Sequence, residues 1–507
     1  MTDITHLGQA ARRAAERFGN KQALVFGGRT FSFVELNDLV ERMAACLAFA
    51  GVAPGDVVTL YAGNSWEWIV SYYAIARAGA VINPVNTMLT PAEVSFVVND
   101  CKACAIIVSK DKLAGAAAVL DQVKLAVIIS DTAPPGMVTF NALLQSHASL
   151  LPEIDVDEES LSTICYTSGT TGQPKGAMQS HRAVITNGSM TAQMQMRGSN
   201  DIIVSALPCP HVYANVVMQS MMFYGATLVL HARFDPAAFL ADIEAHKATI
   251  IDGVPTMYMY MLNAPELART NLSSLSRAYV GGQTMPVATM QRVEKAFGIP
   301  LIELWGMTEI AGLGSTHPLN GRNRHGSIGV ALPYCELRIC DPENPESVMP
   351  PGEAGELQVR GPITMLGYFG DDAKTAETLL PSSWLRTGDM ARKEEDGCVF
   401  IVDRLKDMII TGGFKVYPAE IERVLAGHPD VALCAVGKRA DELKGEIAVA
   451  FVVPTAGAKP DKDALLTYCR EHLAAYKCPR DIRFVADVPK TSTGKIMRRE
   501  LHTLDRD

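Results

Sequence analysis

The sequence lacks the marks of a secreted, membrane-spanning or fibrous protein. Residues 1–26 carry Arg12, Arg13 and Arg17 but no apolar segment of the kind that forms a signal peptide. The longest nearly uncharged stretch, 207–230, is interrupted by prolines, amides and a glycine, which favours a core helix followed by a strand over a membrane span. No fixed-period repeat or low-complexity tract is present. We therefore expect a cytoplasmic protein without a transmembrane segment.

Positive charge is not in excess either. The chain has 46 Lys and Arg against 55 Asp and Glu, a net charge of −9, and the two signs are interspersed. This argues against nucleic acid as a main partner, because binding to a phosphate backbone requires a basic face. It does not exclude an anionic small molecule, since a local group of lysine and arginine can override the overall sign.

The cysteines form no metal-binding or disulfide pattern. The chain has 11 of them, an odd number, and its single C-x-x-C, Cys101 to Cys104, has no second pair or nearby histidine to complete a zinc site. We interpret them as reduced cysteines that pack as small apolar side chains in a cytosolic protein.

What the chain does have is length and an alternation of strand-like and helix-like segments. Its 507 residues exceed what one hydrophobic core usually serves, so two or more domains are expected. Helices are expected at 91–98 and 236–246, the second with Asp235 as N-cap and a proline at its first position. Such alternation predicts an α/β protein with largely parallel sheets. Buried strands are expected at 57–61, 105–108, 126–129, 161–165, 202–206, 227–230 and 249–251.

The pattern changes after residue 400, where glycine and charge cluster before a compact α+β segment with a basic tail. This last part is long enough for a core of its own. Its expected elements are helices at 418–426 and 461–476 and strands at 431–436 and 447–453. The predicted domains are an N-terminal domain, 1–402, and a C-terminal lid, 407–507, with the boundary at 403–406.

The most informative segment is 166–176, Tyr-Thr-Ser-Gly-Thr-Thr-Gly-Gln-Pro-Lys-Gly. Its glycines let the backbone fold closely around an anion, its hydroxyls and amide N–H groups donate to phosphate oxygens, and its lysine adds a positive charge. The spacing does not fit the G-x-x-x-x-G-K-[ST] P-loop. We expect a nucleotide triphosphate to bind at Thr167, Ser168, Gly169, Thr170, Thr171, Gly172 and Lys175.

This loop closely resembles the phosphate loop of the adenylate-forming enzymes, which are acyl-CoA synthetases, luciferases and peptide-synthetase adenylation domains. Further segments match the same superfamily in its order along the chain. They are Gly281-Gly-Gln283, Glu303-Leu304, Trp305-Gly-Met-Thr-Glu309, Thr387-Gly-Asp389, Asp403-Arg-Leu-Lys406, Gly412-Gly-Phe-Lys415 and Pro489-Lys-Thr-Ser-Thr-Gly-Lys495. The resemblance implies a large N-terminal domain with two packed α/β sheets and a small β-barrel-like subdomain, and a small mobile α+β C-terminal domain.

The resemblance also implies roles for charged and hydroxyl side chains. Thr308 meets the α-phosphate and Glu309 binds Mg²⁺, which is ordinary magnesium chemistry for one carboxylate plus phosphate oxygens. Asp389 holds both ribose hydroxyls, Arg404 contacts ribose and phosphate, and Lys495 bridges the substrate carboxylate and the α-phosphate. The strand ends that surround adenine and the adjoining motif contribute Gly282, Gln283, Glu303, Leu304, Trp305 and Gly306.

The chemistry that such a site performs follows from its charges. A carboxylate is a poor electrophile, and attack of its oxygen on the α-phosphate of ATP gives a mixed anhydride in which AMP is the leaving group. Because two anions must meet, cations are needed where charge develops, and Lys495 and Mg²⁺ on Glu309 supply them. The phosphate loop has no nucleophile paired with a base, so covalent catalysis by the protein is disfavoured.

The second half-reaction depends on the acceptor. Gly412 and Gly413 resemble the turn that lines the pantetheine tunnel of acyl-CoA synthetases, and His211 resembles the aromatic gate between that tunnel and the acyl pocket. Lys406 stands at the hinge position of the superfamily. We hypothesise that the lid rotates there, presenting Lys495 for adenylation and Gly412-Gly413 for thioester formation.

The segments that border the acyl pocket in this family contain no Lys, Arg or Asp, and among them only Glu309 carries a carboxylate. This disfavours amino acids and malonate, because a buried ammonium or second carboxylate needs a partner charge. Val212, Tyr213, Val254, Gly281, Met285, Ala311 and Gly312 are the expected pocket residues. Tyr258 and the methionines 218, 221, 222, 257, 259 and 285 are candidates for its wall, with core packing an equal alternative for each methionine.

The function indicated is an ATP-dependent carboxylate–CoA ligase for a medium-chain fatty acid or an aryl or arylpropenoic acid. The alternatives are an enzyme that loads an acyl group onto a carrier protein and a non-catalytic nucleotide-binding or regulatory protein of the same fold. ATP, Mg²⁺ and CoA are the expected cofactors and co-substrates. Further partners considered are a second copy in a homodimer and enzymes that acetylate or deacetylate Lys495, whose charge acetylation would remove.

Overall fold

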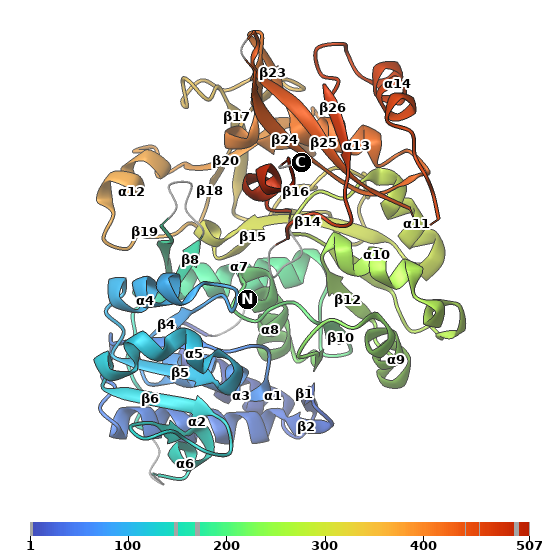
Figure 1. Cartoon of the computed structure of the whole chain (residues 1–507). Coiled ribbons are helices and arrows are strands. Elements are labelled where there is room, and N and C mark those ends of the chain that lie inside the picture. Colours follow the sequence, from blue (N-terminus) through green and yellow to red (C-terminus); the bar gives the residue numbers. More distant parts are fainter. Residues whose placement is uncertain are drawn as a thin grey trace.

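The computed structural model describes residues 4–146, 151–167, 173–441, 443–455, 457–490 and 496–505. Two large mixed sheets and the helices between and around them form the N-terminal domain, and a small C-terminal domain lies above it (Figure 1). In the sequence, the strands of a four-stranded antiparallel sheet lie between the two large sheets and the C-terminal domain. The predicted α/β class, with a large and a small domain, is confirmed.

The eight-stranded sheet supplies the phosphate side of the site. Its middle strands pair in parallel, as predicted, whereas β9 runs antiparallel to β8 and to β19 at one edge. The parallel strands are apolar because both faces are covered. In sheet order the strands are β19 (Gly367–Tyr368), β9 (Lys175–Ser180), β8 (Leu161–Thr167), β4 (Val81–Pro84), β3 (Val57–Tyr61), β5 (Ala105–Ser109), β6 (Leu125–Ile129) and β7 (Val138–Thr139).

The nine-stranded sheet is parallel through its centre and antiparallel at both edges. The predicted strand at 249–251 begins and ends later, because the pairing of β12 with β13 extends to Gly253. The order is β16 (Val330–Ala331), β15 (Gly312–Thr316), β14 (Leu301–Met307), β13 (Arg277–Val280), β12 (Ile250–Gly253), β10 (Ile202–Ser205), β11 (Thr227–Leu230), β1 (Gln22–Phe26) and β2 (Arg29–Ser32).

Two smaller sheets complete the chain. The first is antiparallel and has an apolar cluster on one side that includes Leu357, Val359 and Leu385. Its strands are β17 (Glu336–Cys340), β18 (Ala354–Arg360), β20 (Leu385–Lys393) and β21 (Val399–Arg404). The second belongs to the C-terminal domain, whose own core contains Ile421, Val436 and Leu465. Its strands are β22 (Ile409–Thr411), β23 (Phe414–Val416), β24 (Val431–Asp441), β25 (Gly445–Pro454) and β26 (Asp481–Phe484).

Helices join the two large sheets. Helix α3 packs on β3 and β4, α8 packs on β10 and β11, and α1 and α2 connect these helices through mutual contacts. The helices are α1 (Ala10–Phe18), α2 (Phe33–Phe49), α3 (Trp66–Arg77), α4 (Pro91–Asp100), α5 (Leu113–Ala116), α6 (Phe140–Leu144), α7 (His181–Met194), α8 (Val212–Tyr224), α9 (Pro236–His246), α10 (Pro255–Asn263), α11 (Val287–Phe297), α12 (Asp372–Thr378), α13 (Pro418–Leu425) and α14 (Lys462–His472).

Capping explains where several helices begin. Asp235 accepts a hydrogen bond from Ala238 N at the start of α9, as the sequence predicts, and Thr90 and Glu93 form a capping box on α4. Helix α14 ends four residues before the predicted Tyr476, where Leu473 adopts an extended conformation. Among the described residues, no helix is long and apolar enough to cross a membrane.

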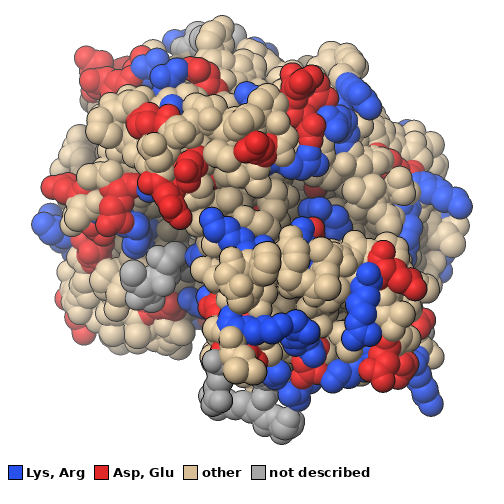
Figure 2. All heavy atoms as spheres, turned by 90° about the horizontal axis from the view of Figure 1, so that it is seen from above, with Lys and Arg blue, Asp and Glu red and all other residues tan. Residues whose placement is uncertain are grey.

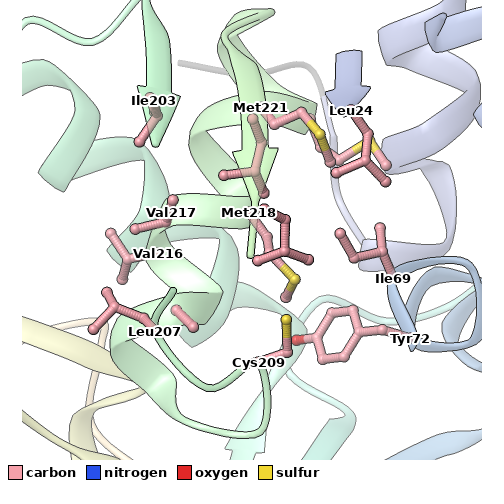
Figure 3. Close-up of a cluster of buried hydrophobic side chains, with 14 of the residues drawn as sticks. Leu24, Ile69, Tyr72, Ile203, Leu207, Cys209, Val216, Val217, Met218 and Met221 are labelled. Carbon is pink, nitrogen blue, oxygen red and sulfur yellow. The ribbon is translucent and has the colours of Figure 1, made fainter. Parts of the chain in front are cut away.

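Helix α8 is buried on nearly all sides, and its methionines belong to the main core. Met221 is 0% exposed and packs in the cluster that contains Leu24, Ile69 and Met218 (Figure 3). Replacing a buried methionine with alanine removes contacts and leaves a cavity that the surroundings fill only in part. We expect Met221→Ala to lower the free energy of unfolding by about 2–5 kcal/mol, measured as a shift in chemical unfolding.

Met88 provides the matched control, since its side chain is 60% exposed. Met88→Ala should change stability by less than about 0.5 kcal/mol. Equal effects of the two substitutions would show that the packing around α8 is not as described.

Candidate functional site

A cavity of about 760 Å³ lies at the strand ends of the two large sheets and beside the four-stranded sheet. Its described charged lining residues gather on one side, and they are Lys175, Glu309, Glu356, Lys374, Glu377, Arg386, Arg404 and Lys406. The other side is formed by Leu207, Pro208, Pro210, His211, Val212, Tyr213, Val254, Gly282, Gly312 and Leu313. The cavity therefore has a charged part and a largely apolar part.

The phosphate loop joins β8 to β9 at the charged part. Thr167 ends β8, Lys175 begins β9, and both line the cavity. The Lys175 ammonium lies 5.9 Å from the ring centroid of Tyr368. The loop residues Ser168, Gly169, Thr170, Thr171 and Gly172 lie outside the described residues.

Glu309 is a buried carboxylate at the edge of this part. It sits with Thr308 in the short helix η5 (Thr308–Ile310), and its exposure is 8%. Burial raises the pKa of Glu309, and a hydrogen bond from the Tyr368 hydroxyl, at 2.9 Å, opposes that rise. Gln179 of β9 donates to the Thr308 carbonyl at 2.8 Å, which connects η5 to the strand that follows the phosphate loop.

The Glu309 carboxylate fits a site for Mg²⁺ that is completed by phosphate. A hard cation accepts oxygen ligands and would relieve the cost of burying the negative charge. The described residues contain no group of three or more His, Cys, Asp or Glu that could hold a metal without such help. The predicted set of one carboxylate plus nucleotide oxygens is therefore compatible with the residues present.

Tyr368 is a site residue that the sequence analysis did not identify. It lies on β19, contacts Glu309 through its hydroxyl and Lys175 through its ring, and lines the cavity. Its sequence signal is weak, because Gly367-Tyr368 has no charge and forms part of a glycine-rich stretch. Only the pairing of β19 with β9 brings this tyrosine to the phosphate loop.

The two predicted ribose contacts meet across β20 and β21. Asp389 pairs with Arg404 in register, and Arg404 Nε lies 2.9 Å from Asp389 Oδ1. Trp305 Nε1 donates to the other carboxylate oxygen at 2.8 Å. The Thr387 hydroxyl accepts a hydrogen bond from Asp389 N and donates one to the Leu357 carbonyl. These bonds fix the backbone of β20 beside Asp389. The pKa of Arg404 is raised, mainly because the negative charge of Asp389 lies next to it.

The residues expected around adenine separate into two groups. Gly282, Leu304 and Gly306 line the cavity. Glu303 is turned away and accepts from Gly326 N at 2.8 Å, and burial raises its pKa to about 7. Gly281 also lies behind the wall, where a Cβ atom would stand 2.1 Å from Leu304 Cδ1.

The C-terminal domain contributes to the site from one side. Lys406 lines the cavity, and Ile496 N donates to Gln283 Oε1 of the N-terminal domain at 3.3 Å. Its neighbour Lys495 lies outside the described residues. Gly412 and Gly413 form the exposed turn between β22 and β23, with φ of 55° and 84°, and are not in the cavity wall in this arrangement.

A cluster of charges links the tail that follows Lys495 to the hinge. Arg498 contacts Asp403 at 3.2 Å, Asp407 at 3.1 Å and Glu422 at 2.6 Å. Asp403 also accepts from Ala419 N at the start of α13, at 2.7 Å. The two contacts of Asp403 join the hinge to the C-terminal domain, whereas the contacts of Arg498 with Asp407 and Glu422 lie within that domain.

The expected acyl-pocket residues are only partly in the wall. His211, the N-cap of α8, lines the cavity together with Val212, Tyr213, Val254 and Gly312. Ala311, Gly281 and Met285 lie behind it, and Met285 is 3% exposed in the main core. Gly312, with a φ of 150°, packs closely against the buried Asn187, because a Cβ atom there would lie 2.5 Å from Asn187 Oδ1.

Of the two alternatives for the methionines, wall or core, core packing is the one observed for most of them. Met218 and Met221 (Figure 3), with Met222, Met257 and Met285, belong to the main core. None of these, nor Met259, is among the lining residues of the cavity. Tyr258 is also 0% exposed, and its hydroxyl donates to the Tyr279 carbonyl at 2.7 Å. Methionine packs well in irregular apolar space, and here that space is the main core.

A charged pair stands behind the apolar part of the cavity. Arg197 forms two hydrogen bonds with Asp252, at 2.9 and 2.7 Å, and both side chains are 0% exposed. The Tyr213 hydroxyl lies 3.2 Å from Asp252 Oδ1. The pocket lining is free of charge on this side, as expected, but the layer behind it is not, because Arg197 and Asp252 come from segments that the sequence did not assign to the pocket.

On the face seen in Figure 2, lysines and arginines are interspersed with aspartates and glutamates. This distribution agrees with the net charge of −9 and with a site whose cations are local.

Two family models match the chain. Residues 11–369 match the AMP-binding enzyme model and residues 420–495 match the AMP-binding enzyme C-terminal domain model. An indoleacetate–CoA ligase from Aromatoleum aromaticum is 34% identical over 96% of this chain and 95% of its own length. A long-chain-fatty-acid–CoA ligase from Bacillus subtilis is 33% identical over 96% of this chain and 92% of its own.

Solved structures show the same fold. ATP-bound MatB from Rhodopseudomonas palustris superposes with a TM-score of 0.91, at 30% identity, over 100% of this chain and 99% of that one. The apo form of the same protein, with the same coverage and identity, gives 0.81. The structure as a whole is therefore more similar to the ATP-bound form than to the apo form.

Proposed function

The chain belongs to the AMP-binding enzyme family, among its AMP-forming acyl-CoA synthetases, and on that basis we propose that it ligates an apolar carboxylic acid to CoA through an acyl-adenylate. The observation that carries the proposal is that one cavity is lined both by predicted nucleotide residues, among them Lys175, Glu309 and Arg404, and by apolar side chains. A charged part suits triphosphate and an apolar part suits the body of the acid.

In the first half-reaction the carboxylate attacks the α-phosphate and pyrophosphate leaves. Lys175 and the loop N–H groups would bind the phosphates, Thr308 the α-phosphate, and Asp389 and Arg404 the ribose. Glu309 would hold Mg²⁺, which supplies positive charge to the phosphate oxygens when bound. Lys495 would bring the two anions together. The contact of the next residue, Ile496, with Gln283 supports this role, because Gln283 is expected to lie beside adenine.

In the second half-reaction the CoA thiol attacks the acyl-adenylate and AMP leaves. Gly412 and Gly413 would line the path of the pantetheine arm after the C-terminal domain has rotated at Lys406. Their exposed turn, without side chains, supports this role because a narrow chain can pass close to the backbone. We assign the described orientation to the adenylation step, and the position of this turn outside the cavity supports that assignment.

The test of the function is pyrophosphate release from ATP with a panel of acids, each with and without CoA. The panel contains fatty acids from acetate to palmitate, benzoates, cinnamates, malonate and amino acids. We expect turnover that requires both an apolar acid and CoA, and none with malonate or amino acids. A single turnover that CoA does not make catalytic would instead indicate a carrier protein as acceptor, and no release with any acid would contradict the proposal.

Tyr368→Phe tests the contact with Glu309. A hydrogen bond to a charged group is worth about 1.5–3 kcal/mol, so we expect kcat/KM for ATP to fall about 10- to 100-fold. In the parent, the hydrogen bond from Tyr368 lowers the pKa of Glu309. Without that bond the pKa of Glu309 should rise, and the acidic limb of the adenylation rate should move to higher pH. The measurement is the pH profile of ATP–pyrophosphate exchange.

Tyr260→Phe is the control for that variant, since Tyr260 is 52% exposed and is not among the lining residues of the cavity. It should leave the profile unchanged. If the pH profile of Tyr368→Phe were identical to that of the parent, the proposed role of Tyr368 in the site would be rejected.

Lys406→Pro tests the hinge. Proline fixes φ near −65° and restricts the preceding residue, so rotation at this position should be hindered. We expect thioester formation to slow while pyrophosphate release in a single turnover is retained. Lys406→Ala removes the same charge and leaves the backbone free, so it should affect the two steps alike, and equal loss of both steps in the proline variant would reject the hinge.

A further inference from the structure

We propose that Asp252, held by Arg197, is a positioning residue that fixes Tyr213 as the end wall of the acyl pocket and thereby limits the length of the acid accepted. This inference rests on the proposed function, because it concerns the site for the acid. It concerns residues that line or stand behind the apolar part of the cavity and that take no part in nucleotide binding.

The ion pair is the anchor of the arrangement. Two parallel hydrogen bonds join the guanidinium of Arg197 to the carboxylate of Asp252, and both side chains are fully buried. Arg197 Nε also donates to Gln195 Oε1 at 2.7 Å, and its guanidinium lies 4.8 Å from the ring centroid of Tyr279. A buried pair with this many partners occupies one geometry, because each lost contact would leave a buried polar group unsatisfied.

Sheet register brings the acceptors for Tyr213 together. Asp252 of β12 lies opposite Tyr279 of β13, so the Asp252 carboxylate and the Tyr279 carbonyl are neighbours. The Tyr213 hydroxyl lies 3.2 Å from Asp252 Oδ1 and 3.3 Å from that carbonyl. Its ring lines the cavity from the first turn of α8. The hydroxyl faces the ion pair, and the ring therefore forms a wall of the pocket.

The charge of Asp252 explains why the Tyr213 ring should stay in place. Burial and the adjacent Asp252 carboxylate both raise the pKa of Tyr213, so the phenol stays protonated and continues to donate. A longer acid would have to displace the ring and leave the Asp252 carboxylate with an apolar neighbour in place of a donor. Such a replacement is costly in a buried site.

The arrangement has a second consequence. If the Tyr213 ring is removed, the space behind it ends on a buried carboxylate rather than on an apolar surface. A longer acid whose far end carries a hydroxyl group can then donate to Asp252, whereas the methyl-terminated acid of equal length cannot. Removing the ring should therefore change both the length and the polarity of the acids accepted.

The experiment compares the parent with Tyr213→Ala, Tyr213→Phe and the double variant Tyr213→Ala/Asp252→Asn. Acid-dependent ATP–pyrophosphate exchange is measured across a series of fatty acids and their terminally hydroxylated analogues. Tyr258→Phe is the matched control, since Tyr258 donates to the same Tyr279 carbonyl but does not line the cavity. Thermal unfolding of each variant establishes that it is folded.

For Tyr213→Ala we expect kcat/KM for acids beyond the parent's optimum to rise on the order of tenfold relative to that optimum. Hydroxylated acids should be preferred over methyl-terminated ones by a similar factor, and the double variant should lose this preference while keeping the longer optimum. Tyr213→Phe, whose ring remains but is no longer tethered, should raise KM for the best acid with little change in kcat or in KM for ATP. Tyr258→Phe should keep the parental length profile.

Unchanged length profiles in the folded Tyr213 variants would overturn the inference while the proposed function stands. A longer optimum in Tyr213→Ala without any preference for the hydroxylated acids would overturn the role of Asp252. Absence of exchange with every acid in the parent itself would overturn the proposed function and this inference together.

Discussion

The hydrogen bond between Tyr368 and Glu309 is the contact on which the arrangement of the site depends. Glu309 follows β14 of the nine-stranded sheet, and Tyr368 lies on β19, which extends the eight-stranded sheet next to β9. The bond therefore joins the two large sheets at the point where β9 begins with Lys175. Gln179 to Thr308 and Met365 to Glu309 are further links across the same boundary. An aromatic hydroxyl suits this position because it donates to a buried carboxylate without adding charge.

Charge is distributed unevenly along the cavity, and this separation corresponds to the two substrates. The phosphate side has lysines and arginines close to acidic partners, such as Arg404 with Asp389 and Arg386 with Glu356. Such pairs keep the cations in place and leave them available to a more strongly charged anion. The acyl side has no charge in its wall but a fully paired charge behind it. Pairing satisfies Arg197 and Asp252 internally, so the wall can be apolar although a buried carboxylate lies within 3.2 Å of it.

The C-terminal domain is held in its described orientation by a small number of polar contacts. Arg498 and Ala419 N contact Asp403, which precedes the proposed hinge residue, and Ile496 N donates to Gln283 of the N-terminal domain. The contacts of Arg498 with Asp407 and Glu422 lie within the C-terminal domain. The domain has its own apolar core, so a change of orientation does not require the main core to open. Contacts of this kind are more easily exchanged than apolar packing, because polar groups released from one partner can bind water or another partner.

The sequence alone was sufficient for the fold class, most strand and helix positions and the family, because periodicity, caps and motif order are local properties. Lys175, Thr308, Glu309, Asp389 and Arg404 were predicted from local motifs. Tyr368, Arg197 and Asp252 were not predicted, and the sequence left open whether the methionines line the pocket or pack in the core.

The reason is physical. Which face of an all-apolar helix meets the cavity, and which neutral side chain reaches a carboxylate, depends on sheet pairing between segments far apart in the chain. Residues 252 and 279 become neighbours only through the register of β12 with β13, and residues 309 and 368 only through the addition of β19 to β9. The sequence by itself determined which chemical groups are available. The tertiary structure decided which of them face the substrates, because burial and hydrogen-bond partners are set by pairing across the sheets.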